Sequence, residues 1–234
     1  MAVDNTISAQ SKEMDMTMEC LNAKSSAPQI LSPRKWRALR TLETVQHMNA
    51  HLLGVLASLA KADGGKHPLE IVNRYRDRWL DLDAPMIQRA ASNPVLLLNV
   101  HFQNEDWWRW AMRGRSGTWR NIRALDAFPA KIAGELMRAA LMLAWPTARE
   151  DRHASRLLFG MSSAVAQLVG ALTAPVIESI ASRHSRELRP RWEDLPTFWE
   201  SLLDAAQSGD DVRLREVHLY SLQVVASELC LFRE

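Results

Sequence analysis

The most distinctive chemistry in the sequence lies between Trp107 and Arg123, where arginine and tryptophan are interleaved. These seventeen residues hold four tryptophans, five arginines and no acidic residue. Arginine pairs with carboxylates and phosphates and stacks on aromatic rings, and both residue types are enriched where proteins contact one another. We expect this segment to bind a partner through Trp107, Trp108, Arg109, Trp110, Arg113, Arg115, Trp119, Arg120 and Arg123.

Other interpretations of the segment stay open. Arginine can pair with phosphates while an aromatic ring stacks on a nucleobase, and basic helices that carry tryptophan lie on anionic membranes. Alternatively, the first three tryptophans fill part of the core while the arginines beside them are solvated or stack on the rings. A second basic run, from Arg183 to Trp192, contains a single acid, Glu187. This run lies at a predicted helix end, where cations offset the helix dipole.

A polar stripe on the first predicted helix is a candidate for metal chemistry. Glu43, His47 and His51 recur every four residues, which places them on one face of a helix. Such ligands at helical spacing can bind Zn²⁺ or Fe²⁺. The stripe points away from the apolar face, so a solvated polar surface is the alternative. The pattern Glu-x-x-His occurs once, at Glu150 and His153, whereas a di-iron bundle requires it twice.

The sequence lacks the motifs of several common enzyme classes. It has no Gly-x-Ser-x-Gly elbow and no glycine-rich phosphate loop. Its two cysteines, Cys20 and Cys230, are too few for a disulfide-stapled scaffold or a multi-cysteine zinc module. We therefore expect no cofactor and assign no catalytic residue, and the sequence favours a protein that is not an enzyme.

Helices must position these side chains. The chain has 234 residues, of which 47% are hydrophobic and 24% are charged, so it can form a core. Apolar residues recur at spacings of three and four, and no long segment alternates with a period of two. We predict an all-α fold, a single compact bundle of about six to eight helices. A disordered tail at residues 1–32 precedes the helical domain at residues 33–234.

Caps, prolines and glycines mark the predicted helix boundaries. The first helix begins at Ser32-Pro33 and ends at Gly64-Gly65. Later helices are predicted over residues 68–83, 85–91, 92–114, 129–145, 147–188 (with a break or kink at Pro175), 196–207 and 211–234.

One stretch has the composition of a membrane span. Residues 157–177 carry no charge and follow three arginines, and this length and basic flank fit a transmembrane helix. Serine, glutamine, two glycines and a proline keep its hydrophobicity borderline. A helix that is buried on all sides has the same appearance, and we predict such a core helix.

The sequence thus favours a non-enzymatic helical binding protein, such as an adaptor, an assembly factor or a regulatory subunit. A protein partner is expected. The alternatives are a peripheral protein of an anionic membrane or lipid-granule surface and a metal-dependent helical-bundle enzyme. Nucleic acid is not expected as the partner, because the formal net charge of +2 is near balance and no nucleic-acid-binding module is visible. Homo-oligomerisation stays open. No secretory signal is evident, so a cytoplasmic location is expected, with membrane association as the alternative.

Overall fold

The computed structural model describes the backbone of residues 33–62, 67–114, 119 and 126–231. The chain divides into two units, Met1–Arg37 and Ala38–Glu234. In the first unit only the opening turn of one helix is described, and the predicted tail at residues 1–32 lies outside the described residues. All contacts given below lie within the unit Ala38–Glu234.

The described part of the chain is all-α, as the sequence predicted. It contains eleven α-helices, one 3₁₀ helix and one pair of short strands. In chain order the α-helices are α2 (Pro33–Ala62), α3 (Glu70–Arg74), α4 (Arg76–Leu80), α5 (Ala84–Ala91), α6 (Glu105–Met112), α7 (Ala130–Glu150), α8 (Arg152–Phe159), α9 (Ser163–Gly170), α10 (Ala174–His184), α11 (Pro196–Ser208) and α12 (Asp211–Leu231). The 3₁₀ helix is η2 (Ser185–Glu187), and the strands are β1 (Leu98–Asn99) and β2 (Arg189–Pro190).

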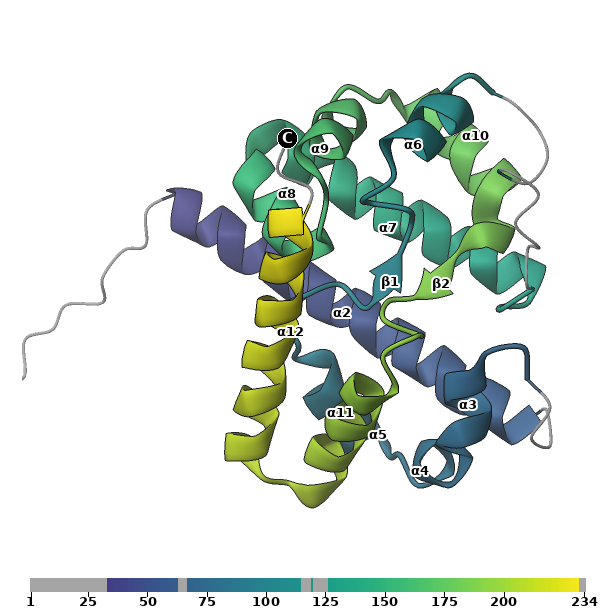
Figure 1. The fold of residues 1–234 in the computed structure, drawn as a ribbon, viewed down its shortest axis with the longest axis vertical. Helices are drawn as coiled ribbons and strands as arrows, with labels where there is room; N and C mark the ends of the chain where they lie inside the picture. The colour runs from purple at the N-terminus through teal and green to yellow at the C-terminus, as the bar shows by residue number, and fades with distance from the viewer. Residues whose placement is uncertain (1–32, 63–66, 115–118, 120–125, 232–234) are drawn as a thin grey trace, which may run out of the picture. The chain divides into compact units, whose positions relative to one another are not determined.

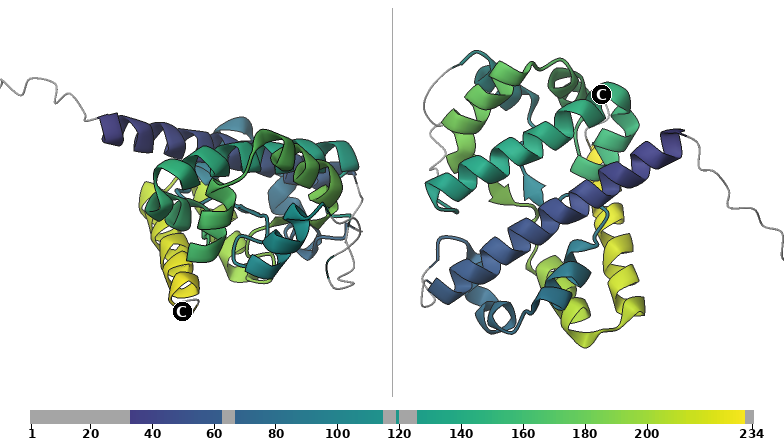
Figure 2. Two further views of the ribbon diagram at one scale, coloured as in Figure 1. Left: turned by 90° about the horizontal axis from the view of Figure 1, so that it is seen from above. Right: turned by 180° about the vertical axis from the view of Figure 1, so that it is seen from behind.

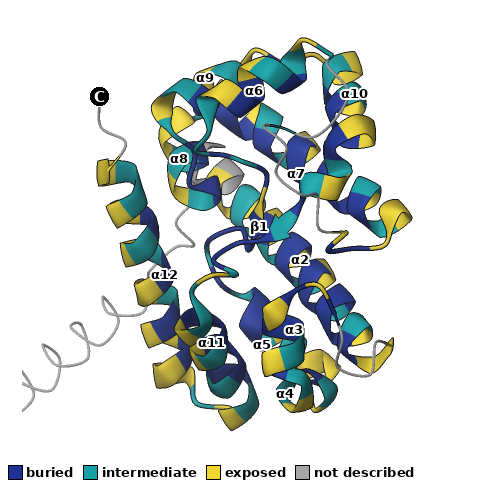
Figure 3. Cartoon of the chain, turned by 45° about the vertical axis from the view of Figure 1, so that its right-hand side comes forward, coloured by how far each residue is buried: buried dark blue, intermediate teal, exposed yellow. Residues whose placement is uncertain are grey.

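The later helices pack in two groups (Figure 1). In one group α7 contacts α8, α9 and α10, and α6 lies against α9 and α10. In the other group α11 contacts α5 and α12, and α12 also contacts α8. Helix α2 passes along both groups, as the view from behind shows (Figure 2). Its side chains at Val45, Leu52 and Leu56 have no exposed surface, and buried residues line the inward sides of the helices (Figure 3).

The paired strands join the middle of the chain to a distant segment. They are antiparallel, with Leu98 opposite Pro190 and Asn99 opposite Arg189. The backbone N–H of Arg191 extends the contact by donating to the carbonyl oxygen of Leu97 at 2.7 Å. The sequence analysis predicted no sheet, because strands of two residues are too short to produce a period of two.

A buried asparagine explains why the chain before α6 is extended. The Asn49 amide donates to the carbonyl oxygen of Val95 at 3.0 Å and accepts from the N–H of Leu97 at 2.8 Å. Residues 95–98 are also all fully buried, which one face of a helix cannot achieve for four successive residues. The predicted helix over residues 92–114 is therefore wrong, and only its later part forms α6.

The single helix predicted over residues 147–188 is also wrong. Capping residues divide this stretch into shorter helices. The Asp151 carboxylate accepts from two backbone N–H groups at the start of α8, each at 3.0 Å. Gly160 ends α8 with a φ of +66°, and the Ser162 hydroxyl caps α9. Residues 157–177 therefore span parts of α8, α9 and α10 rather than one core helix.

Two further boundaries differ from prediction. Helix α7 continues through Pro146 to Glu150, past the predicted end at residue 145. The predicted helix over residues 68–83 is divided into α3 and α4 at Tyr75, whose hydroxyl donates to the carbonyl oxygen of Pro196 at 2.9 Å. The backbone at Tyr75 has a φ of −112° and a ψ of +28°, which interrupts the helical dihedral angles, although the N–H groups of Tyr75 and Trp79 still donate to the carbonyl oxygens four residues earlier.

In the part of the chain that the structure describes, no single helix is long and apolar enough to cross a membrane. Ser163–Gly170 and Ala174–Glu187 have the length and composition of a span only when taken together, and they are bent by 118°. Their side chains at Val165, Val169 and Ile177 are fully buried. These residues therefore belong to the core of the unit.

Candidate functional site

Helix α6 positions the first half of the arginine and tryptophan segment. It begins where the Asn104 side chain accepts from the backbone N–H of Trp107 at 3.0 Å. Trp107 and Trp108 have 0% exposed surface, because α6 is covered by α9 and α10. The indole N–H of Trp108 donates to the carbonyl oxygen of His101 at 3.1 Å. These two predicted contact residues have no surface with which to contact a partner in this structure.

Other members of the segment remain at the surface. Arg109 is exposed and donates to the Glu105 carboxylate at 2.7 Å. Arg113 is exposed and forms no ion pair with any described residue. Trp110 is partly exposed and packs against Trp119, with ring centroids 5.4 Å apart. The predicted contact residues Arg115, Arg120 and Arg123 lie outside the described residues.

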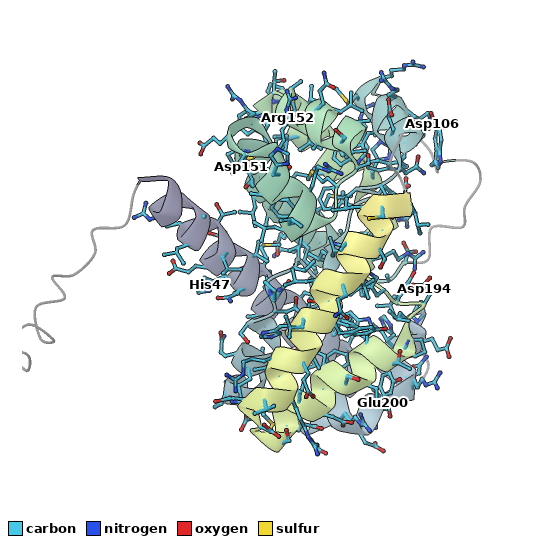
Figure 4. The ribbon with its side chains drawn as sticks, turned by 60° about the vertical axis from the view of Figure 1, so that its left-hand side comes forward. His47, Asp106, Asp151, Arg152, Asp194 and Glu200 are labelled. Carbon is cyan, nitrogen blue, oxygen red and sulfur yellow. The ribbon has the colours of Figure 1, made fainter. Side chains whose placement is uncertain are left out.

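A residue from another helix extends this surface. The exposed Arg183 of α10 donates from its guanidinium to the carbonyl oxygen of Gly114. Two aromatic rings and three cations therefore lie together, with Glu105 and Asp106 on the first turn of α6 (Asp106 is labelled in Figure 4). We call this surface the Arg/Trp face, and its residues are Arg109, Trp110, Arg113, Trp119 and Arg183.

A partly buried carboxylate with two histidines lies beneath this face. Glu187 accepts from the indole N–H of Trp107 at 2.7 Å. Its other close groups are the His101 Nε2 at 3.4 Å and the His184 Nδ1 at 3.3 Å. The His184 ring is fully buried and lies 4.7 Å from the ring of Trp110, centroid to centroid. The cluster therefore supports the partly exposed tryptophan of the Arg/Trp face from below.

Sequence reasoning missed this cluster because its members come from three separate segments. Trp107 and Glu187 are 80 residues apart, and no local spacing relates them. One feature of the sequence could have pointed to the cluster: Glu187 is the single acid between Arg183 and Trp192. The Glu187 carboxylate, the imidazole of His184 and the indole of Trp107 hold one another in position through the contacts given above.

The environment of Glu187 strongly favours its charged form. Burial by itself raises the pKa of Glu187. Hydrogen bonds lower it, and the donors are His101, His184 and Trp107; the charge of His101 lowers it further. The lowering effects together exceed the effect of burial. They lower the pKa from 4.5 to about 2. A carboxyl with a depressed pKa stabilises the fold above its unfolded pKa, and this contribution is lost as the pH falls through the folded value.

Glu187→Gln is therefore expected to lower the free energy of unfolding at pH 7 by about 1–3 kcal/mol. The difference between variant and parent should shrink as the pH falls from about 4.5 towards 2. Urea unfolding at pH 7, 5, 4 and 3, followed by tryptophan fluorescence, measures it. A difference that stays the same across this range would show that the charge on Glu187 contributes nothing.

The residues predicted to bind metal do not form a compact ligand group. Glu43, His47 and His51 are all exposed on α2, and His47 is labelled in Figure 4. Glu150 and His153 lie on α7 and α8, and both are exposed. Among the described residues, no three or more histidine, cysteine, aspartate or glutamate side chains are placed to hold a metal ion.

A buried charge lies between β2 and α11. Arg191 is 5% exposed, and its Nη2 donates to the Glu228 carboxylate of α12 at 2.6 Å. The other Glu228 oxygen accepts from the indole N–H of Trp192 at 2.7 Å. Burial lowers the pKa of Arg191, and the neighbouring charge of Glu228 opposes that effect. Sequence reasoning placed Arg191 at a helix end and missed this pair.

Comparison of the chain with protein-family models, with curated proteins and with solved structures finds no match in any of the three.

Proposed function

We propose that the protein is a non-enzymatic helical binding protein that contacts an acidic segment of a protein partner through the Arg/Trp face. The observation that carries this proposal is the exposed Arg113, which has no ion-pair partner among the described residues and lies beside the partly exposed Trp110. An arginine with free donors can bind carboxylates in a bidentate manner, and an adjacent tryptophan supplies apolar contact area.

The burial of Trp107 and Trp108 favours a protein partner over a membrane. A helix that lies on a membrane needs a broad exposed apolar face. On α6 the two tryptophans that would form such a face are fully buried, and Trp110 is only partly exposed. The near-balanced net charge of +2 likewise gives little general attraction to nucleic acid. An acidic protein segment fits a small basic and aromatic surface better.

A comparative pull-down tests the proposal. The bait is the full chain, either unchanged or with Arg113→Glu, and the control bait carries Arg152→Glu. Arg152 is exposed on α8 (Figure 4) and has the same charge. We expect Arg113→Glu to recover at least about tenfold less of one specific protein, because a lost interface arginine commonly costs more than 1.4 kcal/mol. Arg152→Glu should recover as much as the unchanged chain.

A second pair of variants tests the aromatic part of the face. Trp110→Ala with Arg113→Ala removes a ring and a cation from the face, and Trp145→Ala with Arg149→Ala removes the same types from α7. The guanidinium of Arg149 lies 5.4 Å from the ring centroid of Trp145. Equal recovery by both double variants contradicts the proposed site. So does an eluate in which the retained species is lipid or nucleic acid.

A further inference from the structure

Helix α12 carries apolar side chains on its outer side as well as on its buried side (Figure 3). Leu214, Val217 and Val225 are buried against the rest of the unit, whereas Val212 is 56% exposed and Leu219 is 60% exposed. The last two are seven residues apart, which places them two turns apart on one face of the helix. A single exposed apolar residue is ordinary on a protein surface, but two that are aligned on one helix face can form a seam with another helix.

Two charged side chains lie between these apolar residues on the same face. Arg215 and Glu216 follow Val212 by three and four residues, the spacing at which side chains share a helix face, and both are exposed. Neither forms an ion pair with any residue that the structure describes, and the Nε of Arg215 donates to the carbonyl oxygen of Asp211 at 3.2 Å. Successive residues point about 100° apart around a helix, so these two charges do not pair with each other. Both can therefore pair with charges on another molecule.

The order of these four residues is symmetrical about the point between Arg215 and Glu216. Three residues beyond each of these charges lies an apolar residue, Val212 on one side and Leu219 on the other. When two copies of the helix lie antiparallel about a twofold axis at that point, each contact occurs twice. Arg215 then faces Glu216 of the second copy, and Val212 faces Leu219 of the second copy. A parallel pair in register would instead place arginine against arginine and glutamate against glutamate, and these repel.

A groove between α11 and α12 borders this face and widens it. Its volume is about 350 Å³, and its lining includes Ser201 and Asp204 of α11 and Glu216 and Tyr220 of α12. Tyr220 is 37% exposed, and tyrosine is enriched in protein interfaces. A specific interface buries about 800 Å² on each partner, which exceeds what a short stretch of one helix offers, so residues of α11 are expected to take part. The carboxylate of Asp204 already pairs with Arg78 at 2.6 Å, which leaves Glu216 as the acid of this groove that can receive a new cation.

We infer that the outer face of α12 binds a second copy of this chain. The two α12 helices pack antiparallel, and Arg215 of each copy pairs with Glu216 of the other. Val212 and Leu219 pack together on either side of the two ion pairs. The face favours a second copy over an unrelated partner because its charges and its apolar residues match their own sequence in reverse order. The Arg/Trp face consists of other residues, so this inference and the proposed function can fail separately.

Charge exchange tests the pairing, with dimerisation of the full chain measured by sedimentation velocity from about 5 to about 500 μM. Arg215→Glu and Glu216→Arg each place like charges opposite one another across the axis, so each should weaken dimerisation at least about tenfold. The double variant Arg215→Glu with Glu216→Arg restores opposite charges and should dimerise as the unchanged chain does. The control is Arg152→Glu, an exposed charge reversal on α8 that should have no effect. A chain that stays monomeric over this range overturns the inference, and so does a double variant that dimerises no better than the single variants.

Disulfide crosslinking tests the orientation of the two helices. Val212→Cys and Leu219→Cys are made separately in a chain whose own cysteines are removed by Cys20→Ser and Cys230→Ser. Antiparallel packing predicts a crosslinked dimer when the two variants are mixed and oxidised, and much less product when either is oxidised alone, because a disulfide requires the two Cβ atoms to be close. The control mixes Val212→Cys with Leu157→Cys, an exposed position on α8, and should give no product. Efficient crosslinking of Val212→Cys with itself, or equal crosslinking in the control mixture, would overturn the inference.

Discussion

Glu228→Ala is expected to lower the free energy of unfolding by about 3–5 kcal/mol, because it removes the counter-charge of the buried Arg191. The side chain of Arg191 is only 6% exposed, so its charge would remain in the core without a counter-charge. The indole N–H of Trp192 would lose its acceptor as well. Urea unfolding followed by tryptophan fluorescence measures the change, since the chain contains nine tryptophans.

The surface pair of Arg138 and Glu178 provides the matched control. These side chains are 46% and 52% exposed. Glu178→Ala should therefore lower the free energy of unfolding by no more than about 1 kcal/mol. The double variant Arg191→Met with Glu228→Leu should regain most of the stability lost in Glu228→Ala, because replacing both charges leaves neither one uncompensated. Equal losses in Glu228→Ala and Glu178→Ala would contradict the assignment of a buried pair.

Gly160→Ala is expected to lower the free energy of unfolding by at least about 3 kcal/mol, for two separate reasons. The backbone at Gly160 has a φ of +66°, and an L-residue in this left-handed region costs about 1–2 kcal/mol. The new Cβ would also collide with the Arg191 guanidinium. Because Arg191 is held by Glu228, relief of the collision requires the buried ion pair to shift.

Gly209→Ala separates these two contributions in the same unfolding measurement. Gly209 ends α11 with a φ of +71°, and no atom lies within 4 Å of a Cβ built there. Gly209→Ala is therefore destabilised only by the left-handed backbone conformation, and its free energy of unfolding should fall by about 1–2 kcal/mol. If the two glycine variants lose the same stability, the close packing of Arg191 on Gly160 is not a determinant of the fold.

Caps, prolines and apolar spacing correctly predicted the helices whose ends depend on residues close by in the sequence. The first helix was expected to begin at Ser32-Pro33 and to end at Gly64-Gly65, and α2 occupies Pro33–Ala62. Its apolar spacing and its proline act within a few residues. The final helix was predicted over residues 211–234 on the same grounds, and α12 begins at Asp211.

The predictions failed where a distant residue decides the backbone. The extended chain before α6 depends on hydrogen bonds to Asn49, which lies 46 residues before Val95. Local spacing contains no information about such contacts, so helix was the natural prediction for this stretch.

The candidate site shows the same limit. The sequence identified the Arg/Trp segment but could not tell that Trp107 and Trp108 are buried while Trp110 is partly exposed, because this depends on how α9 and α10 cover α6. The link between Arg191 and Glu228 spans 37 residues. Neither residue could be assigned to an ion pair until the fold brought α12 to the end of β2.

Site-specific photocrosslinking tests the proposed Arg/Trp face most directly. A benzophenone side chain at position 113 captures only molecules that touch this surface, and the same group at position 152 of α8 is the control. We expect position 113 to crosslink one protein through a segment rich in aspartate and glutamate, and position 152 to give no such product. Crosslinks to lipid or nucleic acid at position 113, or the same products at both positions, would contradict the proposal.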